Sequence, residues 1–169
     1  LAAVTSAALG VEASRRGPLV GGSPLGSWSA AVIVGGAGLV PSLFAGLAFE
    51  ALTLPCDVDA GARFLLLLGG GNVVLGATLG FLAGCAWPRS PRLAPLAVVL
   101  GVDLVWLVFG LLRLYEGPQI RLWVSPLGYW PGSLYDEALA PTADLWSFRA
   151  FGVLLALGLI ALTAAVAPG

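Results

Sequence analysis

The chain has 169 residues and a net charge of −1; 59% of its residues are hydrophobic and 10% are charged. A soluble domain carries about 25% charged residues, so this composition excludes a soluble globular protein, and the absence of a basic excess excludes a surface for nucleic acid. All eight basic residues are Arg and none is His. Because His is the commonest metal ligand and general base, we expect no metal and no cofactor.

The first apolar stretch, at residues 1–13, is shorter than the about 20 residues that a spanning helix needs. Met is absent and residue 1 is Leu. We therefore expect a fragment of a longer protein, with this stretch as a truncated first helix. The tail of a signal peptide is the alternative, but a signal peptide carries a charged n-region that these residues lack.

Four longer apolar stretches follow, at residues 27–54, 62–87, 93–115 and 147–166. Each has the length and hydropathy of a membrane-spanning helix. The first would be about 42 Å long as a helix, more than the about 30 Å of hydrocarbon, so we expect a tilt or a kink at Pro41. The stretches predict an all-α, polytopic transmembrane helical bundle in a single domain over residues 1–169, with four full spans plus a truncated N-terminal span.

Arg pairs in the connections indicate an orientation. Arg15 and Arg16 precede the first long stretch, and Arg89 and Arg92 lie between the second and the third. The positive-inside tendency places both pairs in the cytoplasm of a bacterial cell, and the connection at residues 116–146 outside the inner membrane. Cys56 and Cys85 are then expected at opposite ends of one span, too far apart for a disulfide.

Small residues recur at intervals of four in two of the predicted helices, which places them on one helix face. They are Gly38, Ser42 and Gly46 in residues 27–54, and Gly76, Gly80 and Gly84 in residues 62–87. Such faces let two helices approach closely, so we predict a seam between these two helices, with a substrate path between them as the alternative. The run at residues 69–71, all Gly, would be either an unwound ion-binding segment or a loose helix packed on a neighbour.

Two acids lie within the predicted spans. Asp103 is near the middle of residues 93–115, where a charge costs at least about 2.5–3.5 kcal/mol on insertion scales, and Asn72 has a similar depth in the preceding span. We therefore predict that Asp103 faces the bundle interior and meets Asn72 or another polar partner. Glu50 lies nearer the outer surface. Its candidate partners there are Arg63, Arg113 and Arg149. The alternative is that Asp103 and Glu50 relay protons or cations.

The connection at residues 116–146 is rich in aromatic side chains, which suit the headgroup layer of a membrane. They include Trp123, Tyr129, Trp130, Tyr135 and Trp146. Ser-Pro and Trp-Pro-Gly steps predict turns, and residues 133–140 could form a short helix. We expect an ordered loop on the membrane surface. The alternative is a lid or docking surface built from Trp130, Tyr135, Asp136 and Glu137.

The string Gly-Tyr-Trp-Pro-Gly-Ser-Leu-Tyr-Asp-Glu at residues 128–137 resembles a loop in a family of uncharacterised bacterial multi-span membrane proteins. Cys56-Asp57 at the mouth of a helix is similar too. The resemblance implies the membrane-embedded part of a longer protein, in which a soluble extracytoplasmic domain can follow, and it implies no activity.

These observations predict a membrane-embedded anchor or scaffold region of a larger bacterial protein, with the lipid bilayer, other membrane subunits or a fused soluble domain as partners. A small transporter or channel-like subunit that uses Asp103 and Glu50 is the alternative. An intramembrane enzyme with residues 116–146 as a lid comes third, because no P-loop, Gly-x-Ser-x-Gly or His-Glu-x-x-His motif is present. A transporter should have a cavity that reaches Asp103, whereas a scaffold should be a dry bundle whose polar groups pair with one another.

Overall fold

The computed structural model describes residues 2–16, 23–52, 58–116, 122–124, 128–130 and 143–166. Its helices are α1 (Ala2–Arg16), α2 (Pro24–Ala37), α3 (Val40–Leu52), α4 (Val58–Phe64), α5 (Gly71–Ala86), α6 (Leu93–Glu116) and α7 (Ala143–Val166). A π-helical segment, Leu65–Gly70, joins α4 to α5. Two short strands, β1 (Leu122–Val124) and β2 (Gly128–Trp130), pair antiparallel with Trp123 opposite Tyr129.

Among the described residues, four helical segments are long and apolar enough to cross a membrane: Pro24–Ala48, Gly61–Ala86, Leu93–Leu112 and Leu145–Ala165. They correspond to the four long apolar stretches, so the prediction of a helical membrane protein is confirmed. Many of their large apolar side chains are exposed; Val105 is 68% and Leu154 is 67% accessible. Apolar surface of this extent is unfavourable in water and suits contact with lipid.

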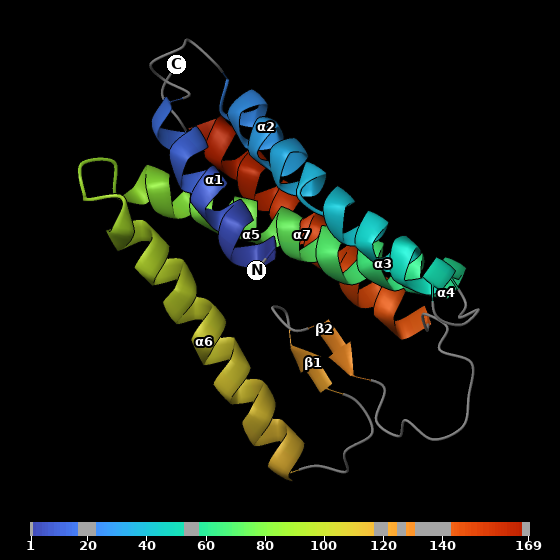
Figure 1. Ribbon diagram of the computed structural model, residues 1–169. Coiled ribbons are helices and arrows are strands. Elements are labelled where there is room, and N and C mark those ends of the chain that lie inside the picture. The colour runs from blue at the N-terminus through green and yellow to red at the C-terminus, as the bar shows by residue number, and fades with distance from the viewer. Residues whose placement is uncertain are drawn as a thin grey trace.

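Helix α5 is the centre of the arrangement, and α1, α2 and α7 pack along it (Figure 1). Helix α6 follows α5 after a short connection and then leans away from the other helices. Its far end contacts β1 of the hairpin. The molecule therefore has a closely packed part around α1 and α5, and a more open part between α6 and the rest.

The kink expected at Pro41 is a break between α2 and α3. Helix α2 ends at Ala37, four residues before Pro41. In a continuous helix the ring of Pro41 would clash with the Ala37 carbonyl, and proline has no N–H to donate to it. At the end of α2, the N–H of Gly38 donates to the carbonyl oxygens of Val34 and Gly35, at 3.3 and 3.2 Å. The long apolar stretch is thus divided into two helices.

The small-residue face of α5 packs against α1, so our prediction that it meets residues 27–54 is wrong. A Cβ on Gly80 would overlap the carbonyl oxygen of Ala7, and Gly10 of α1 has the same relation to the carbonyl oxygen of Ala77. Gly76 and Gly84 also lie against α1. Their contacts there are Ala3, Ser6, Val11 and Ser14. Close backbone approach of this kind lets helices associate in lipid without a hydrophobic driving force.

The other half of the predicted seam has no such partner within the described chain. A Cβ on Gly46 would meet nothing within 4 Å, and one on Gly38 would meet only the carbonyl of Gly35 in its own helix. Ser42 and Gly46 instead line a shallow hollow against α4 and Leu65. Helix α1 has the better matching surface, because its own face is built from small residues. They are Ala3, Ala7, Gly10 and Ser14.

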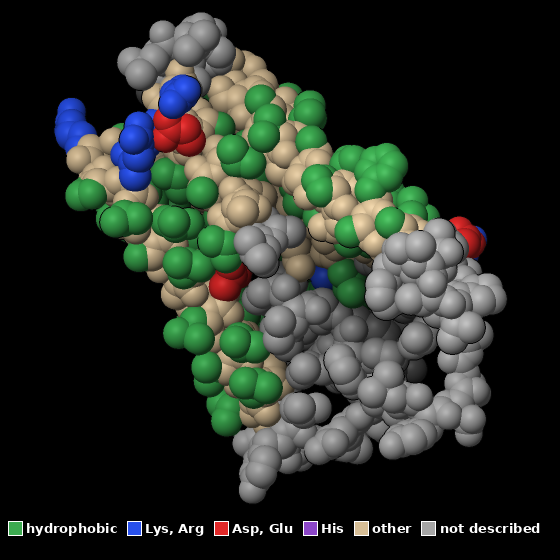
Figure 2. All heavy atoms as spheres, in the orientation of Figure 1, with side chains coloured by type: hydrophobic (Ala, Val, Ile, Leu, Met, Phe, Trp, Pro, Cys, Tyr) green, Lys and Arg blue, Asp and Glu red, His purple; other side chains and the backbone are tan. Residues whose placement is uncertain are grey.

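Charged side chains hold the connection between α5 and α6 to α1. The Arg15 guanidinium donates to the carbonyl oxygens of Ser90 at 2.7 Å and of Trp87 at 3.5 Å. The Glu12 carboxylate pairs with Arg16 at 2.6 Å and with Arg92 at 3.2 Å. Figure 2 shows the basic and acidic side chains gathered at this end of the molecule, with hydrophobic side chains spread along its length.

Candidate functional site

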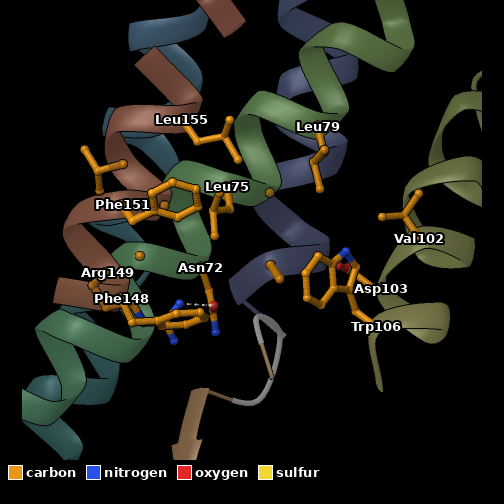
Figure 3. Close-up of a pocket in the computed structure, with 15 residues that line it drawn as sticks. Asn72, Leu75, Leu79, Val102, Asp103, Trp106, Phe148, Arg149, Phe151 and Leu155 are labelled. Carbon is orange, nitrogen blue, oxygen red and sulfur yellow. Dashed lines mark hydrogen bonds between the residues drawn. The ribbon is translucent and has the colours of Figure 1, made fainter. Parts of the chain in front are cut away.

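A cavity of about 190 Å³ lies between α5, α6 and α7, closed on one side by Ala3 of α1. Most of its wall is apolar. The larger apolar side chains are Leu75 and Leu79 from α5, Val102 and Trp106 from α6, and Phe151 and Leu155 from α7 (Figure 3). Three polar side chains interrupt this wall: Asn72, Asp103 and Arg149. Apolar cavities with a few convergent polar groups are the usual form of ligand sites.

Arg149 is the most unusual of these residues, because it is a buried charge near one end of the apolar segment of α7. It is 4% exposed. Its Nη1 donates to the Asn72 Oδ1 at 3.2 Å, whereas its Nε and Nη2 are buried without a hydrogen-bond partner. The Phe148 ring lies 5.4 Å from the guanidinium carbon and contributes a cation–π contact.

The backbone of α5 makes room for this guanidinium. A Cβ on Gly71 would lie 2.9 Å from the Arg149 Cδ and 3.3 Å from its Nε, so any other residue would displace the side chain. The π-helical turn, Leu65–Gly70, ends immediately before Gly71. π-Helical turns inside α-helices occur frequently at functional sites. The weak point expected at residues 69–71 is therefore a helical turn that accommodates Arg149, with no unwinding.

Asp103 lies across the cavity on α6, half-buried and next to Trp106 (Figure 3). It faces the interior of the molecule, as predicted. The predicted pair with Asn72 is absent among the described contacts, and the Asn72 amide oxygen accepts a hydrogen bond from Arg149. Within the described residues Asp103 has neither a hydrogen bond nor an ion pair. The cavity thus has an unpaired carboxyl group on one wall and an incompletely paired guanidinium on the other.

Several predicted site residues fall outside this cavity or outside the described side chains. Arg63, a candidate partner of Glu50, forms an ion pair with Asp59 on its own helix. The side chains of Glu50 and Arg113 lie outside the described part of the structure, as does Cys56. Cys85 is a free, exposed thiol.

Most of the predicted loop residues also lie outside the described part of the structure. The backbone of Trp130 ends β2, opposite Leu122, but its side chain is not among those described. Tyr135, Asp136 and Glu137 lie outside the described residues, together with the short helix expected at 133–140. The hairpin itself was not expected. Its signal is a Ser-Pro turn between Leu-Trp-Val and Gly-Tyr-Trp, two segments of high strand propensity.

Arg149 entered the sequence analysis only as a possible partner of Glu50. The signal that marks it is its position inside an apolar segment, Leu145–Ala165, where an arginine must find a polar partner or a cavity. The described residues contain no group of three or more His, Cys, Asp or Glu side chains that could hold a metal ion.

The cavity can hold a polar group within the apolar part of the molecule, with one charge of each sign to receive it. In comparisons with known proteins, the chain matches no family model, no curated sequence and no solved structure.

Proposed function

We propose that the protein is a membrane-embedded binding protein of the transporter or channel-like kind, and that the cavity between α5, α6 and α7 receives its solute. The observation that carries this proposal is that one cavity reaches both Asp103 and Arg149. Among the described residues Asp103 has no hydrogen bond or ion pair, and two nitrogens of Arg149 have no partner. We also propose that the end with Arg15, Arg16, Arg89 and Arg92 faces the cytoplasm of a bacterial cell, on the positive-inside tendency.

The energetics favour a ligand-binding role over a purely structural one for this cavity. A charged side chain in the centre of a spanning helix costs at least about 2.5–3.5 kcal/mol, so such residues pair with one another or line a water-filled path. A bundle that served only as an anchor would be expected to pair Asp103 with Arg149 or to replace both by apolar residues. The π-helical turn before Gly71 and the missing Cβ at Gly71 instead keep space around Arg149.

An anchor or scaffold role is the second candidate, and a specific observation favours it. Helices α1 and α5 are packed with backbone-to-backbone contact along the face that contains Gly76, Gly80 and Gly84. A rigid helix pair of this kind suits a platform for a fused domain or for another membrane subunit. The two roles differ in whether water enters the cavity.

Cysteine accessibility tests that difference. In a background with Cys56→Ser and Cys85→Ser, Val102→Cys places a thiol on the cavity wall, and Val105→Cys places one three residues along α6, where the side chain is 68% exposed and outside the cavity lining. The nucleophile that attacks a thiol reagent is the thiolate, which forms in water and not in hydrocarbon. With the protein in membranes, a charged, water-soluble reagent should modify Val102→Cys about tenfold faster or more than Val105→Cys.

Equal, slow modification of the two cysteines would contradict the proposal, because it would indicate a dry cavity and leave the anchor role. Reagent applied from one face of sealed vesicles at a time also gives the side from which the cavity opens.

A further inference from the structure

The unpaired edge of Arg149 has the geometry of an anion receptor. Its Nη1 is occupied by the Asn72 amide, and the two unpartnered nitrogens are Nε and Nη2. These two nitrogens carry the parallel N–H groups that form one edge of the guanidinium plane. That edge matches the two oxygens of a carboxylate or a phosphate, which is the bidentate arrangement for which arginine is preferred over lysine.

Arg149 lines the cavity, and the two nitrogens of this edge are buried without a hydrogen-bond partner among the described residues. The side chain is 4% exposed, Gly71 lies against it, and the Phe148 ring centroid is 5.4 Å from the guanidinium carbon. A buried donor without a partner is unfavourable. A ligand group that accepts hydrogen bonds from both nitrogens would replace the hydrogen bonds to water that burial removed. The walls beside it are leucine, valine and phenylalanine side chains. They exclude water from the contact and so strengthen a charge-assisted hydrogen bond.

The opposite wall has the complementary charge. Asp103 lines the same cavity from α6 and has no hydrogen bond or ion pair within the described residues (Figure 3). A carboxylate beside the Trp106 ring suits a primary ammonium group, which donates hydrogen bonds to the former and makes a cation–π contact with the latter. The volume of about 190 Å³ is below the about 300–1,000 Å³ of drug-sized sites, so the ligand, or the part of it that enters, is small.

We propose that this cavity binds a zwitterion, with its carboxylate or phosphate on the Nε–Nη2 edge of Arg149 and its primary ammonium group at Asp103. This inference rests on the proposed function and narrows it to one class of ligand. Two sources carry this chemistry: a free amino acid in water, and the head group of an aminophospholipid such as phosphatidylethanolamine in the bilayer.

The test measures ligand binding to the full chain, purified in detergent and stripped of lipid. L-Alanine and short-chain phosphatidylethanolamine represent the two sources. Propionate and short-chain phosphatidylethanol are the matched ligands that keep the carboxylate or phosphodiester and lack the ammonium group. Binding is followed by the rise in melting temperature and by isothermal titration. The wild-type protein should bind one of the two zwitterions, and the one that it binds identifies the source.

Three variants locate the two charges of the ligand. Arg149→Gln should weaken binding of the zwitterion and of its anionic analogue by about thirtyfold or more, because a buried charged hydrogen-bond pair is lost. Asp103→Asn should weaken the zwitterion, whereas the anionic analogue should bind at least as well, because a carboxylate that repels it is removed. Arg63→Gln is the control, since Arg63 pairs with Asp59 outside the cavity. It should bind as the wild type does.

Folding of each variant is checked by gel filtration and by its melting temperature without ligand. If Arg149→Gln does not fold, Arg149→Lys replaces it. Lysine keeps the charge and loses the planar edge, so binding should again weaken.

Equal affinity of the Arg149 and Arg63 variants for the zwitterion would overturn the assignment of the anion to Arg149. Equal losses for zwitterion and analogue in Asp103→Asn would overturn the assignment of the ammonium group. Binding of neither zwitterion by the wild type would overturn the inference as a whole. The proposed function is tested separately: a water-accessible Val102→Cys in a protein that binds no zwitterion leaves the function standing and removes only the ligand class.

Discussion

Helix α5 has glycines on two sides, and they accommodate different neighbours. Toward α1, Gly80 and Gly84 remove side chains so that two backbones come into contact. Toward α7, Gly71 removes a side chain so that the Arg149 guanidinium can lie across the helix. The first arrangement fills space and the second keeps space for a charge. A glycine in a membrane helix therefore indicates close approach, but what approaches is decided by the neighbouring helix.

The largest effect should follow from filling the close-packed side. Gly80→Leu puts a side chain where the Ala7 backbone lies, and a backbone contact cannot relax by a change of rotamer. We expect a loss of about 3 kcal/mol or more in the free energy of unfolding, measured by denaturant titration in detergent. Gly158→Leu in α7 is the matched control, because a Cβ there meets nothing within 4 Å. Similar losses in the two variants would show that the α1–α5 contact is not special.

A substitution on the cavity side should raise the free energy of unfolding instead of lowering it. Arg149→Leu removes a buried, incompletely paired charge, so the ligand-free protein should gain about 1–2 kcal/mol in unfolding free energy while it loses ligand binding. Arg63→Leu, at an exposed pair, should change stability by less than about 1 kcal/mol. A destabilisation by Arg149→Leu comparable to that of Gly80→Leu would mean that Arg149 is a structural residue like those of the seam.

The smallest predicted effect concerns the charged side chains that link α1 to the connection between α5 and α6. The hydrogen bond from Arg16 holds the pKa of Glu12 below its ordinary value. Desolvation raises this pKa but is outweighed, because the charges of Arg92, Arg16 and Arg15 also lower it. A carboxylate with a lowered pKa in the folded state stabilises that state at neutral pH. The contribution is lost as the pH falls below the ordinary carboxyl value and through the lowered one.

The melting temperature of the wild type, measured from pH 7 down to pH 3, should therefore fall more than that of Glu12→Gln. The difference between the two proteins should be largest at neutral pH and should vanish at the acid end. Because these side chains are solvent-accessible, high salt should reduce the difference as well. A constant difference across the whole range would contradict the role of the Glu12 charge.

The helices of this protein follow from hydropathy alone, because apolar runs of spanning length have few alternatives in lipid. The break before Pro41 also follows, since proline chemistry acts locally. The partner of the α5 glycine face did not follow. Spacing places Gly76, Gly80 and Gly84 on one face, but the choice between α1 and the segment containing Gly46 depends on which surfaces fit in three dimensions.

The candidate site was predicted only in part, for a related reason. Asp103 and Asn72 stood out because they interrupt apolar runs, and both line the cavity. Among the described contacts the two do not pair, and the Asn72 amide oxygen accepts a hydrogen bond from Arg149. Arg149 lies near a helix end, where an arginine side chain commonly extends to the interface. Only the three-dimensional arrangement shows that it turns inward across Gly71.

The polar ties between α1 and the connection at Trp87–Arg92 have a mechanical consequence. They hold α6 to the bundle at one end, near Val99, which is itself buried against Ala7 and Ala83. A small rotation of α6 about that end displaces each residue in proportion to its distance from it. Trp106, and Asp103 just before it, would therefore move further than Val99. A change in the tilt of α6 would therefore change the width of the cavity and displace Asp103 with it.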